Sequence, residues 1–100
     1  MYMVRHIWNC ERGKAPECLE DIKAVNSEFV SDGNGSGKIY VDYSNRMDTI
    51  VWELEVESLD EYFSGQRAYY AGLTPDTRNP IDRFNSNTVV GTREIFEVIV

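Results

Sequence analysis

The segment from Thr49 to Val56 reads T-I-V-W-E-L-E-V, and its pattern decides the fold of this chain. One alternating set of its side chains is large and apolar throughout: Ile50, Trp52, Leu54 and Val56. The other set is mixed, because a valine stands among a threonine and two glutamates. A strand with one face in water normally alternates apolar with polar residues. We therefore expect a β-strand whose second face is also partly covered.

The end of the chain has the same property. Residues 93–100 read R-E-I-F-E-V-I-V and predict a last strand. On one side of this strand lie Phe96, Val98 and Val100, and on the other side lie Ile95 and Ile99. Neither side is polar enough to face water along its whole length, so a second covering layer is expected here as well.

The first third of the chain predicts a strand and a helix. Residues 2–10 are rich in β-branched and aromatic residues, which is typical of a strand. A helix is expected from Pro16, where the missing N–H has no cost, to about Val30. Three glycines within residues 32–37 predict that a flexible loop follows this helix.

The middle of the chain predicts a hairpin and a second helix. A strand at 38–44 and the strand at 49–56 are separated by a short turn, so they should pair antiparallel. Ser58 and Glu61 form a capping-box pattern that starts a helix reaching about Tyr70. The aromatic stripe on this helix is more often core packing than a cofactor site.

Residues 72–91 form the least regular stretch. Asn79 as a cap and Pro80 as a first helical residue, with Ile81 and Phe84 one turn apart, predict about two turns of helix there. The main elements then follow the order β-α-β-β-α-β, the ferredoxin-like split unit. We expect one α+β domain over residues 1–100, with a four-stranded antiparallel sheet and two helices on one face.

The two faces of this sheet are assigned from the apolar content of each alternating set. The helix-covered face is expected to hold Ile39, Val41, Tyr43, Ile50, Trp52, Leu54, Val56, Phe96, Val98 and Val100. The open face then holds Arg5, Ile7, Asn9, Tyr40, Asp42, Val51, Glu53, Glu55, Arg93, Ile95, Glu97 and Ile99. In the first strand the choice is close, because the other set is Val4, His6, Trp8 and Cys10. Aliphatic patches mixed with charges suit a sheet that stacks on its two-fold mate around a small, partly polar cavity. We therefore expect a homodimer formed through the open sheet face.

Composition narrows the partners and the compartment. Ten basic and seventeen acidic residues give a net charge of −7, which argues against nucleic acid and against anionic membrane surfaces. No apolar run is long enough to span a membrane, and the N-terminus lacks a signal-peptide pattern. Cys10 and Cys18 match no zinc or redox spacing. A cytoplasmic protein with two free thiols is expected, and a disulfide between them is the alternative.

Three segments carry a family resemblance: V-R-H-I-W at 4–8 with Gly13-Lys14 after it, V-W-E-L-E-V-E-S-L-D-E-Y at 51–62, and G-T-R-E-I-F-E-V at 91–98. Together they touch every expected strand except the second. In these segments the chain resembles the dimeric α+β barrel superfamily. Within it, the chain is similar to the NIPSNAP-like branch, which neighbours the antibiotic-biosynthesis monooxygenase-like proteins. The resemblance implies a homodimer in which the two sheets face each other.

The same resemblance suggests a chemistry. Cofactor-free oxygenases of this superfamily oxidise aromatic polyketides, and Asn9 resembles the asparagine that some of them place on the first strand. Haem-degrading relatives carry a Trp and a His on the second helix, and residues 58–70 contain neither, which argues against haem degradation. His6 is the only histidine, so any imidazole general base must be this residue; a hydrogen-bonded packing role is the alternative.

Charged and aromatic residues supply the candidate ligand-binding set, which is Arg5, Tyr43, Trp52, Glu53 and Arg93. Glu53 and Glu55 share one face of one strand, where they either form an acid/base pair or are neutralised by Arg5 and Arg93. No metal-ligand spacing, phosphate loop or dinucleotide fingerprint is present, so neither a metal nor a cofactor is expected.

Three functions are consistent with the sequence, and it leaves open whether the protein is an enzyme. The first is a small-molecule-binding homodimer. The second is a cofactor-independent monooxygenase or isomerase for an aromatic or polyketide-like compound, with His6 and Asn9 as catalytic residues. The third is a structural or interaction dimer with a filled barrel. The first two require a cavity between sheet and helices of more than about 300 Å³, lined by Arg5, Asn9, Tyr43 or Trp52.

Overall fold

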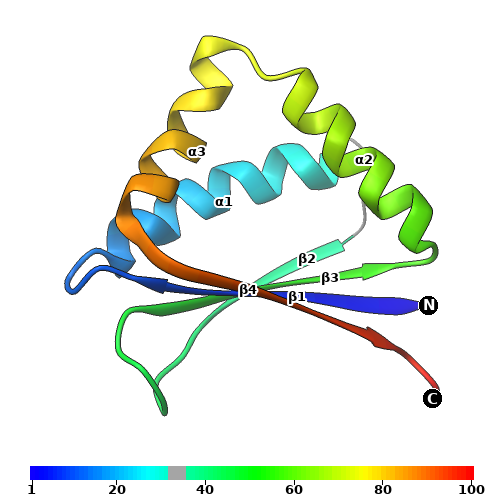
Figure 1. The fold of residues 1–100 in the computed structure, drawn as a ribbon, viewed down its shortest axis with the longest axis horizontal. Helices are drawn as coiled ribbons and strands as arrows, with labels where there is room; N and C mark the ends of the chain where they lie inside the picture. Colours follow the sequence, from blue (N-terminus) through cyan, green and yellow to red (C-terminus); the bar gives the residue numbers. More distant parts are fainter. Residues whose placement is uncertain (32–35) are drawn as a thin grey trace.

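Strand β1 (Tyr2–Cys10) runs through the interior of a four-stranded antiparallel sheet. The computed structural model describes residues 1–31 and 36–100, and in it the order of strands is β2-β3-β1-β4. Figure 1 shows the sheet edge-on, with the helices stacked on one of its faces and the other face bare. The ferredoxin-like α+β architecture predicted from the sequence is therefore confirmed.

The other strands match the expected hairpin and closing strand, with shifted ends. Strand β2 (Ser36–Val41) pairs antiparallel with β3 (Thr49–Val56), as the short turn predicted. β2 ends before the expected residue 44 because the Asp42 carboxylate accepts hydrogen bonds from the backbone N–H groups of Ser44 and Asn45, at 2.8 and 3.1 Å. These bonds turn the chain locally in place of the sheet ladder.

Strand β4 (Thr88–Glu97) pairs with β1 and begins five residues before the predicted start at Arg93. Helix α3 ends at Asn87, so the chain passes from helix to strand without a loop. The expected loop at 32–37 overlaps β2 at its last two residues, and its remaining part lies outside the described residues.

Two helices follow the sequence closely. Helix α1 (Ala15–Ser31) crosses the sheet, and helix α2 (Leu59–Ala71) follows β3. Ser58 caps α2, because its hydroxyl accepts a hydrogen bond from the backbone N–H of Glu61 at 3.3 Å.

The third helix corrects the prediction of two turns starting at Pro80. Helix α3 (Pro75–Asn87) has 13 residues and contains Pro80 in its interior. Thr74 caps it by accepting from the N–H of Thr77, and Pro75 takes the first helical position. The pair Thr74-Pro75 therefore carries the same start signal as Asn79-Pro80, five residues earlier in the sequence. The helix count on the covered face is accordingly three, not two, for the described residues.

The core lies between the sheet and the helices. Its buried apolar members are Val4, Cys10, Cys18, Ile22, Val25, Phe29, Ile50, Trp52, Leu54, Val56, Tyr62, Ile81 and Phe84. This core decides which side of the first strand faces the helices. Val4 and His6 are buried under the helices, and Arg5 faces the other side with Glu53. The apolar set of β3 faces the helices as predicted.

The face assignment of the last strand was wrong. Arg93 lies opposite His6 and Ile95 lies opposite Val4, and cross-strand partners share a face, so both point toward the helices. Glu94 and Phe96 point away from them. Both alternating sets of this segment are apolar, so apolar content alone does not determine the register, and a shift of one residue reverses every side chain.

Candidate functional site

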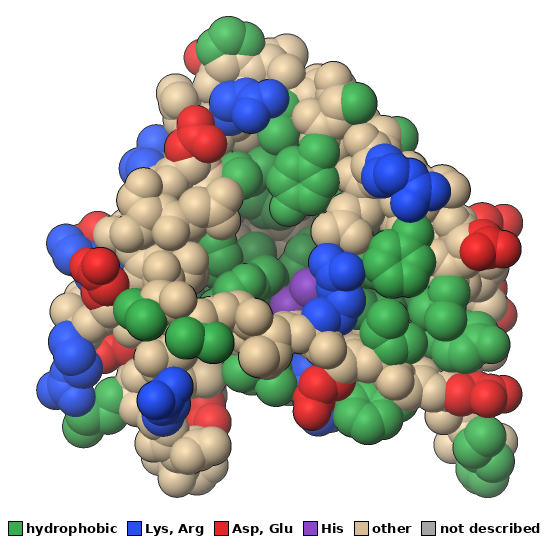
Figure 2. Space-filling model, viewed as in Figure 1, with side chains coloured by type: hydrophobic (Ala, Val, Ile, Leu, Met, Phe, Trp, Pro, Cys, Tyr) green, Lys and Arg blue, Asp and Glu red, His purple; other side chains and the backbone are tan. Residues whose placement is uncertain are grey.

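A cavity of about 380 Å³ lies between the sheet and the helices, and it exceeds the volume that the ligand-binding hypotheses require. Figure 2 shows it as a hollow at the centre of this view, with the histidine at its bottom and a basic side chain beside it. The cavity is lined by His6, Trp8, Ile22, Val25, Phe29, Trp52, Tyr62, Gln66, Tyr69, Tyr70, Ile81, Phe84, Asn85, Gly91, Thr92 and Arg93.

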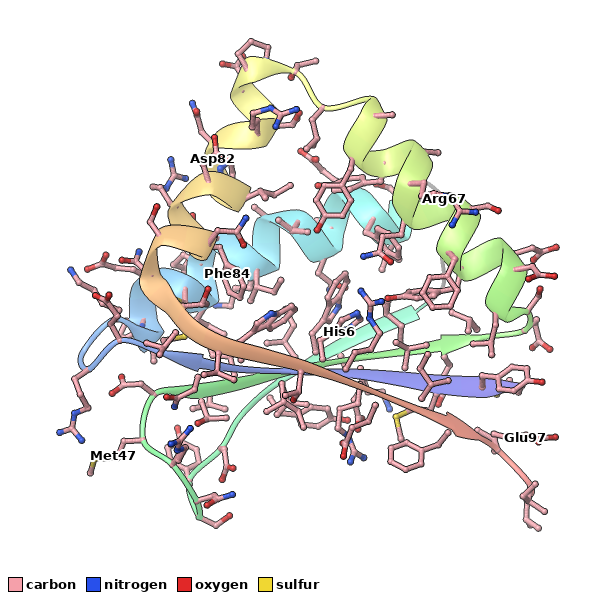
Figure 3. The ribbon with its side chains drawn as sticks, in the orientation of Figure 1. His6, Met47, Arg67, Asp82, Phe84 and Glu97 are labelled. Atoms are coloured by element: carbon pink, nitrogen blue, oxygen red, sulfur yellow. The ribbon has the colours of Figure 1, made fainter. Side chains whose placement is uncertain are left out.

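Aromatic rings form a large part of the cavity wall. The His6 ring stacks on Trp8 and on Trp52, with centroids 5.4 and 4.9 Å away. Phe84 meets Trp8 edge-on at 4.8 Å, and Phe29 meets Trp52 edge-on at 5.5 Å. Figure 3 shows His6 rising from the sheet and Phe84 reaching from α3 into the same space. Interlocked rings of this kind hold one another in place and offer flat apolar surfaces to a ligand.

A glycine on β4 makes room for the Trp8 indole. A Cβ atom on Gly91 would lie 2.8 Å from Trp8 Cδ1 and 3.0 Å from Nε1, closer than side chains approach one another. The neighbouring Trp52 indole donates its N–H to Asn26 Oδ1 at 2.7 Å. Both indoles are therefore fixed by their immediate surroundings.

The two ring nitrogens of His6 are both hydrogen-bonded. Nδ1 lies 3.1 Å from the carbonyl oxygen of Trp52, and Nε2 lies 2.8 Å from the hydroxyl of Tyr62. A carbonyl oxygen only accepts, so Nδ1 carries the proton and donates. In the neutral ring Nε2 is then the acceptor, and the Tyr62 hydroxyl donates to it. The two bonds join β1, β3 and α2 at one point.

The imidazole of His6 is neutral at physiological pH. Burial lowers the pKa of His6 to about 4, and the nearby positive charge of Arg93 lowers it further, against the opposing effect of the Trp52 carbonyl. Burial likewise raises the pKa of the Tyr62 hydroxyl, and Arg93 opposes that rise. The pair therefore consists of an uncharged base and an uncharged acid in contact.

Arg93 is the only Lys or Arg among the described residues that line the cavity. Its guanidinium lies over the rings of Tyr62 and Phe63, 5.8 and 5.6 Å from their centroids. It also donates to Gln66 Oε1 at 3.4 Å. Arg93 is exposed, so this cation lies where the cavity meets solvent.

The structure separates the residues that the sequence grouped as one site. His6, Trp52 and Arg93 line the cavity together. Arg5, Asn9 and Glu53 line an open groove of about 660 Å³ on the bare face of the sheet. Tyr43 is 96% exposed in the β2–β3 turn and lines neither. The expectation was that Arg5, Asn9, Tyr43 or Trp52 lines the cavity between sheet and helices. Trp52 does, and the other three do not.

The two residues Asn9 and Arg5 make structural contacts on the bare face. The Asn9 amide donates to the carbonyl of Met47 and to the Thr49 hydroxyl, at 3.0 and 3.2 Å, beside the hairpin turn. Arg5 binds Glu53 at 2.8 Å and Glu94 at 3.4 Å. These contacts raise the pKa of Arg5, and they lower that of Glu53 although its partial burial acts in the opposite direction. Arg5 thus neutralises Glu53 as one hypothesis held, and Arg93 does not, because it lies on the other face.

Tyr62 is the site residue that sequence reasoning passed over. It belongs to the aromatic stripe of the helix at 59–71, which was interpreted as core packing, and it is indeed 3% exposed. The signal that pairs it with His6 is a contact across 56 positions, which no local pattern reveals. Gln66 and Asn85, which also line the cavity, were missed as well.

The described residues give little support for thiol chemistry or for a metal site. Cys10 and Cys18 are free and buried, and burial together with Cys18 raises the pKa of Cys10 to about 12, so its thiol is unreactive at neutral pH. Residues 1–31 and 36–100 contain no group of three His, Cys, Asp or Glu side chains arranged to hold a metal ion. Within the same ranges, no helix has the length and apolar character needed to cross a membrane.

Comparison with known proteins identifies the fold. No protein-family model and no curated protein matches the sequence. A NIPSNAP family protein of unknown function from Agrobacterium tumefaciens is 15% identical with a TM-score of 0.82, over 98% of this chain and 87% of that one. An uncharacterized NIPSNAP domain protein from Burkholderia xenovorans is 11% identical with a TM-score of 0.81, over 98% and 94%. A structure of an antibiotic biosynthesis monooxygenase is 11% identical with a TM-score of 0.75, over 100% of both chains. The chain therefore has the fold of NIPSNAP and antibiotic biosynthesis monooxygenase structures, as the resemblance implied.

The lowered pKa of His6 predicts a pH-dependent stability. Between the unfolded pKa of 6.5 and the folded pKa of about 4, the unfolded chain binds a proton that the folded chain does not. The free energy of unfolding should therefore fall by roughly 2–3 kcal/mol as the pH drops from 7 to 4. Urea denaturation across this range measures it. His6→Gln should lose this part of the pH dependence while the carboxylates titrate equally in both proteins; an identical pH slope in the two proteins would contradict the assignment.

Proposed function

We propose that this protein is a homodimer that binds a small planar aromatic molecule in the cavity between its sheet and its helices. The observation that carries the proposal is the neutral His6 ring stacked against two neighbouring indoles at the bottom of a 380 Å³ cavity. Ligand sites are typically concave and mostly apolar, with a few polar groups that orient the ligand. Here the flat faces of Trp8 and Trp52 supply the apolar walls. Tyr62 and Arg93 supply the polar groups.

The dimer part of the proposal rests on the bare face of the sheet. Large apolar side chains remain exposed on it: Tyr40 is 42%, Val90 45% and Phe96 45% exposed. Isologous two-fold pairing is the commonest way to cover such a face. Arg5 pairs with Glu53 and Glu94 in its own subunit, and the Phe96 ring lies 5.5 Å from its guanidinium. The charge of Arg5 would therefore already be neutralised when two subunits associate. The two free thiols suit a reducing compartment, so we place the dimer in the cytoplasm.

A second candidate function is the oxidation of an aromatic carbon acid by O₂ without a cofactor. The observation that favours it is the hydrogen bond from the Tyr62 hydroxyl to the neutral His6 ring, a route for a proton out of the cavity. One structure with this fold is named an antibiotic biosynthesis monooxygenase. His6 is a weak base because of its lowered pKa, so the substrate must lose its proton easily. The substrate's own aromatic rings delocalise the charge of the resulting anion, and Arg93 stabilises that charge.

The chemistry of this candidate balances with O₂ as the only oxidant. Tyr62 relays a proton from a CH₂ group of the substrate to His6. The carbanion combines with O₂ and recovers the proton as a hydroperoxide, R₂CH–OOH. Loss of water then breaks the O–O bond and leaves a carbonyl group. One CH₂ group and one O₂ thus give one C=O group and one water molecule.

Binding is tested with 2-naphthoate, a planar two-ring acid. The only two tryptophans of the chain both line the cavity, so a ligand there should quench the intrinsic fluorescence in a saturable way. Ile81→Phe adds a ring to the cavity wall and should weaken binding about tenfold, or ~1.4 kcal/mol. Ala24→Phe adds the same ring at an exposed position on α1 and should leave binding unchanged. Absence of saturable quenching, or equal loss in both variants, would sink the binding proposal.

Catalysis is tested with anthrone under air, by following the appearance of anthraquinone. His6→Gln and Tyr62→Phe should each lower turnover by at least about a hundredfold. Asn9→Ala should have no effect, because Asn9 lies on the opposite face of the sheet. If the unmodified protein forms no product above the rate in buffer, the oxygenase candidate fails and the binding proposal stands alone.

Dimerisation is tested by sedimentation velocity at micromolar concentration. The unmodified chain should sediment as a dimer. Ile7→Lys places a charge in the middle of the bare face and should shift the protein to monomers, whereas Ala24→Lys on the exposed side of α1 should not. A monomeric unmodified chain would refute this part of the proposal.

A further inference from the structure

The direction of the hydrogen bonds through His6 determines what Tyr62 offers to a ligand. Nδ1–H donates to the Trp52 carbonyl, so Nε2 takes the proton of the Tyr62 hydroxyl at 2.8 Å. A tyrosine hydroxyl has one proton and two acceptor positions. Turning that proton toward a ligand would leave Nε2 as a buried acceptor without a donor. Tyr62 therefore meets the cavity as an acceptor only.

Arg93 has the opposite property. A guanidinium donates hydrogen bonds and never accepts them. Its position over the Tyr62 ring, 5.8 Å from the centroid, puts a cation next to the acceptor. Gln66 accepts from one end of the guanidinium at 3.4 Å, which orients it across the cavity mouth. Tyr62 and Arg93 thus present an acceptor and a cationic donor to a cavity with flat aromatic walls.

We propose that Tyr62 and Arg93 together make the cavity specific for an aromatic acid that carries a free phenolic hydroxyl. The acid group binds Arg93, and the hydroxyl donates to Tyr62 while the ring lies against the indoles. Tyr62 is the specificity-determining residue, and His6 is a positioning residue that fixes the direction of the Tyr62 proton. This inference rests on the proposed binding function, because it names the ligand class of the same cavity.

The chemistry predicts a definite order of affinities. A ligand without the hydroxyl leaves the Tyr62 acceptor unpaired in a buried site, and a methyl ether at the same position cannot donate and adds bulk. We expect 4-hydroxy-2-naphthoate to bind about tenfold more tightly than 2-naphthoate, and more tightly still than 4-methoxy-2-naphthoate. In this probe the hydroxyl and the carboxylate are not adjacent on the ring. The hydroxyl is therefore free to bind the protein.

Variants assign the discrimination to single residues. Tyr62→Phe should bring the affinity ratio of 4-hydroxy-2-naphthoate to 2-naphthoate close to one, because no acceptor then distinguishes the two acids. Tyr70→Phe makes the same change at another tyrosine that lines the cavity from α2 and should keep the ratio. Arg93→Gln should weaken all three acids alike by about tenfold and keep the ratio, and Arg93→Lys should restore part of the loss.

The outcomes separate this inference from the function on which it rests. If 2-naphthoate and its hydroxy derivative both fail to bind the unmodified protein, the proposed function falls and the inference with it. If they bind and the methyl ether binds as tightly as the phenol, the cavity remains a binding site and the assignment to Tyr62 is overturned. The series on the unmodified protein decides this even if Tyr62→Phe does not fold. Loss of discrimination in Tyr62→Phe but not in Tyr70→Phe supports it.

Discussion

The pocket depends on the two hydrogen bonds of one imidazole ring. His6 holds the Trp52 carbonyl on one neighbouring strand and the Tyr62 hydroxyl on α2, and its ring lies against two indoles. Three elements that are distant in sequence therefore meet at a single small group. A neutral imidazole has one donor and one acceptor, so it satisfies this arrangement in only one tautomer. Protonation would place a charge in a site shielded from water and near the positive Arg93, which explains why the pKa of His6 is lowered to about 4.

Much of the architecture was predictable because the patterns that encode it are local. The all-apolar set of β3 and the cap at Ser58 each arise from neighbouring residues, and both agree with the structure. The errors fall where two local signals compete. Thr74-Pro75 and Asn79-Pro80 both resemble a helix start, and only the first is used. In β4 both sides are apolar, so the pairing of Arg93 with His6 is decided by the register against β1 and by no property of the segment itself.

The candidate site was predictable only in part, for a related reason. Residue type singles out His6, Trp52 and Arg93, because a lone histidine, a strand tryptophan and an arginine in an apolar segment are unusual. The face of the sheet on which such a residue lies depends on register, and this separates them from Arg5 and Asn9. Tyr62 has no unusual sequence environment. Its role comes from a partner 56 positions away, and a contact between residues so far apart does not produce a periodic pattern in the sequence.

Strand β4 carries consecutive side chains that belong to different surfaces. Arg93 contributes to the wall of the cavity, and Glu94, the next residue, binds Arg5 on the opposite face. A shift of this edge strand against β1 moves both side chains together, since the strand between them is one pleated backbone. In a molecule paired through the bare face, filling the cavity and joining the subunits would be thermodynamically linked through β4. If a ligand in the cavity strengthens dimerisation by some factor, dimerisation strengthens the affinity for that ligand by the same factor.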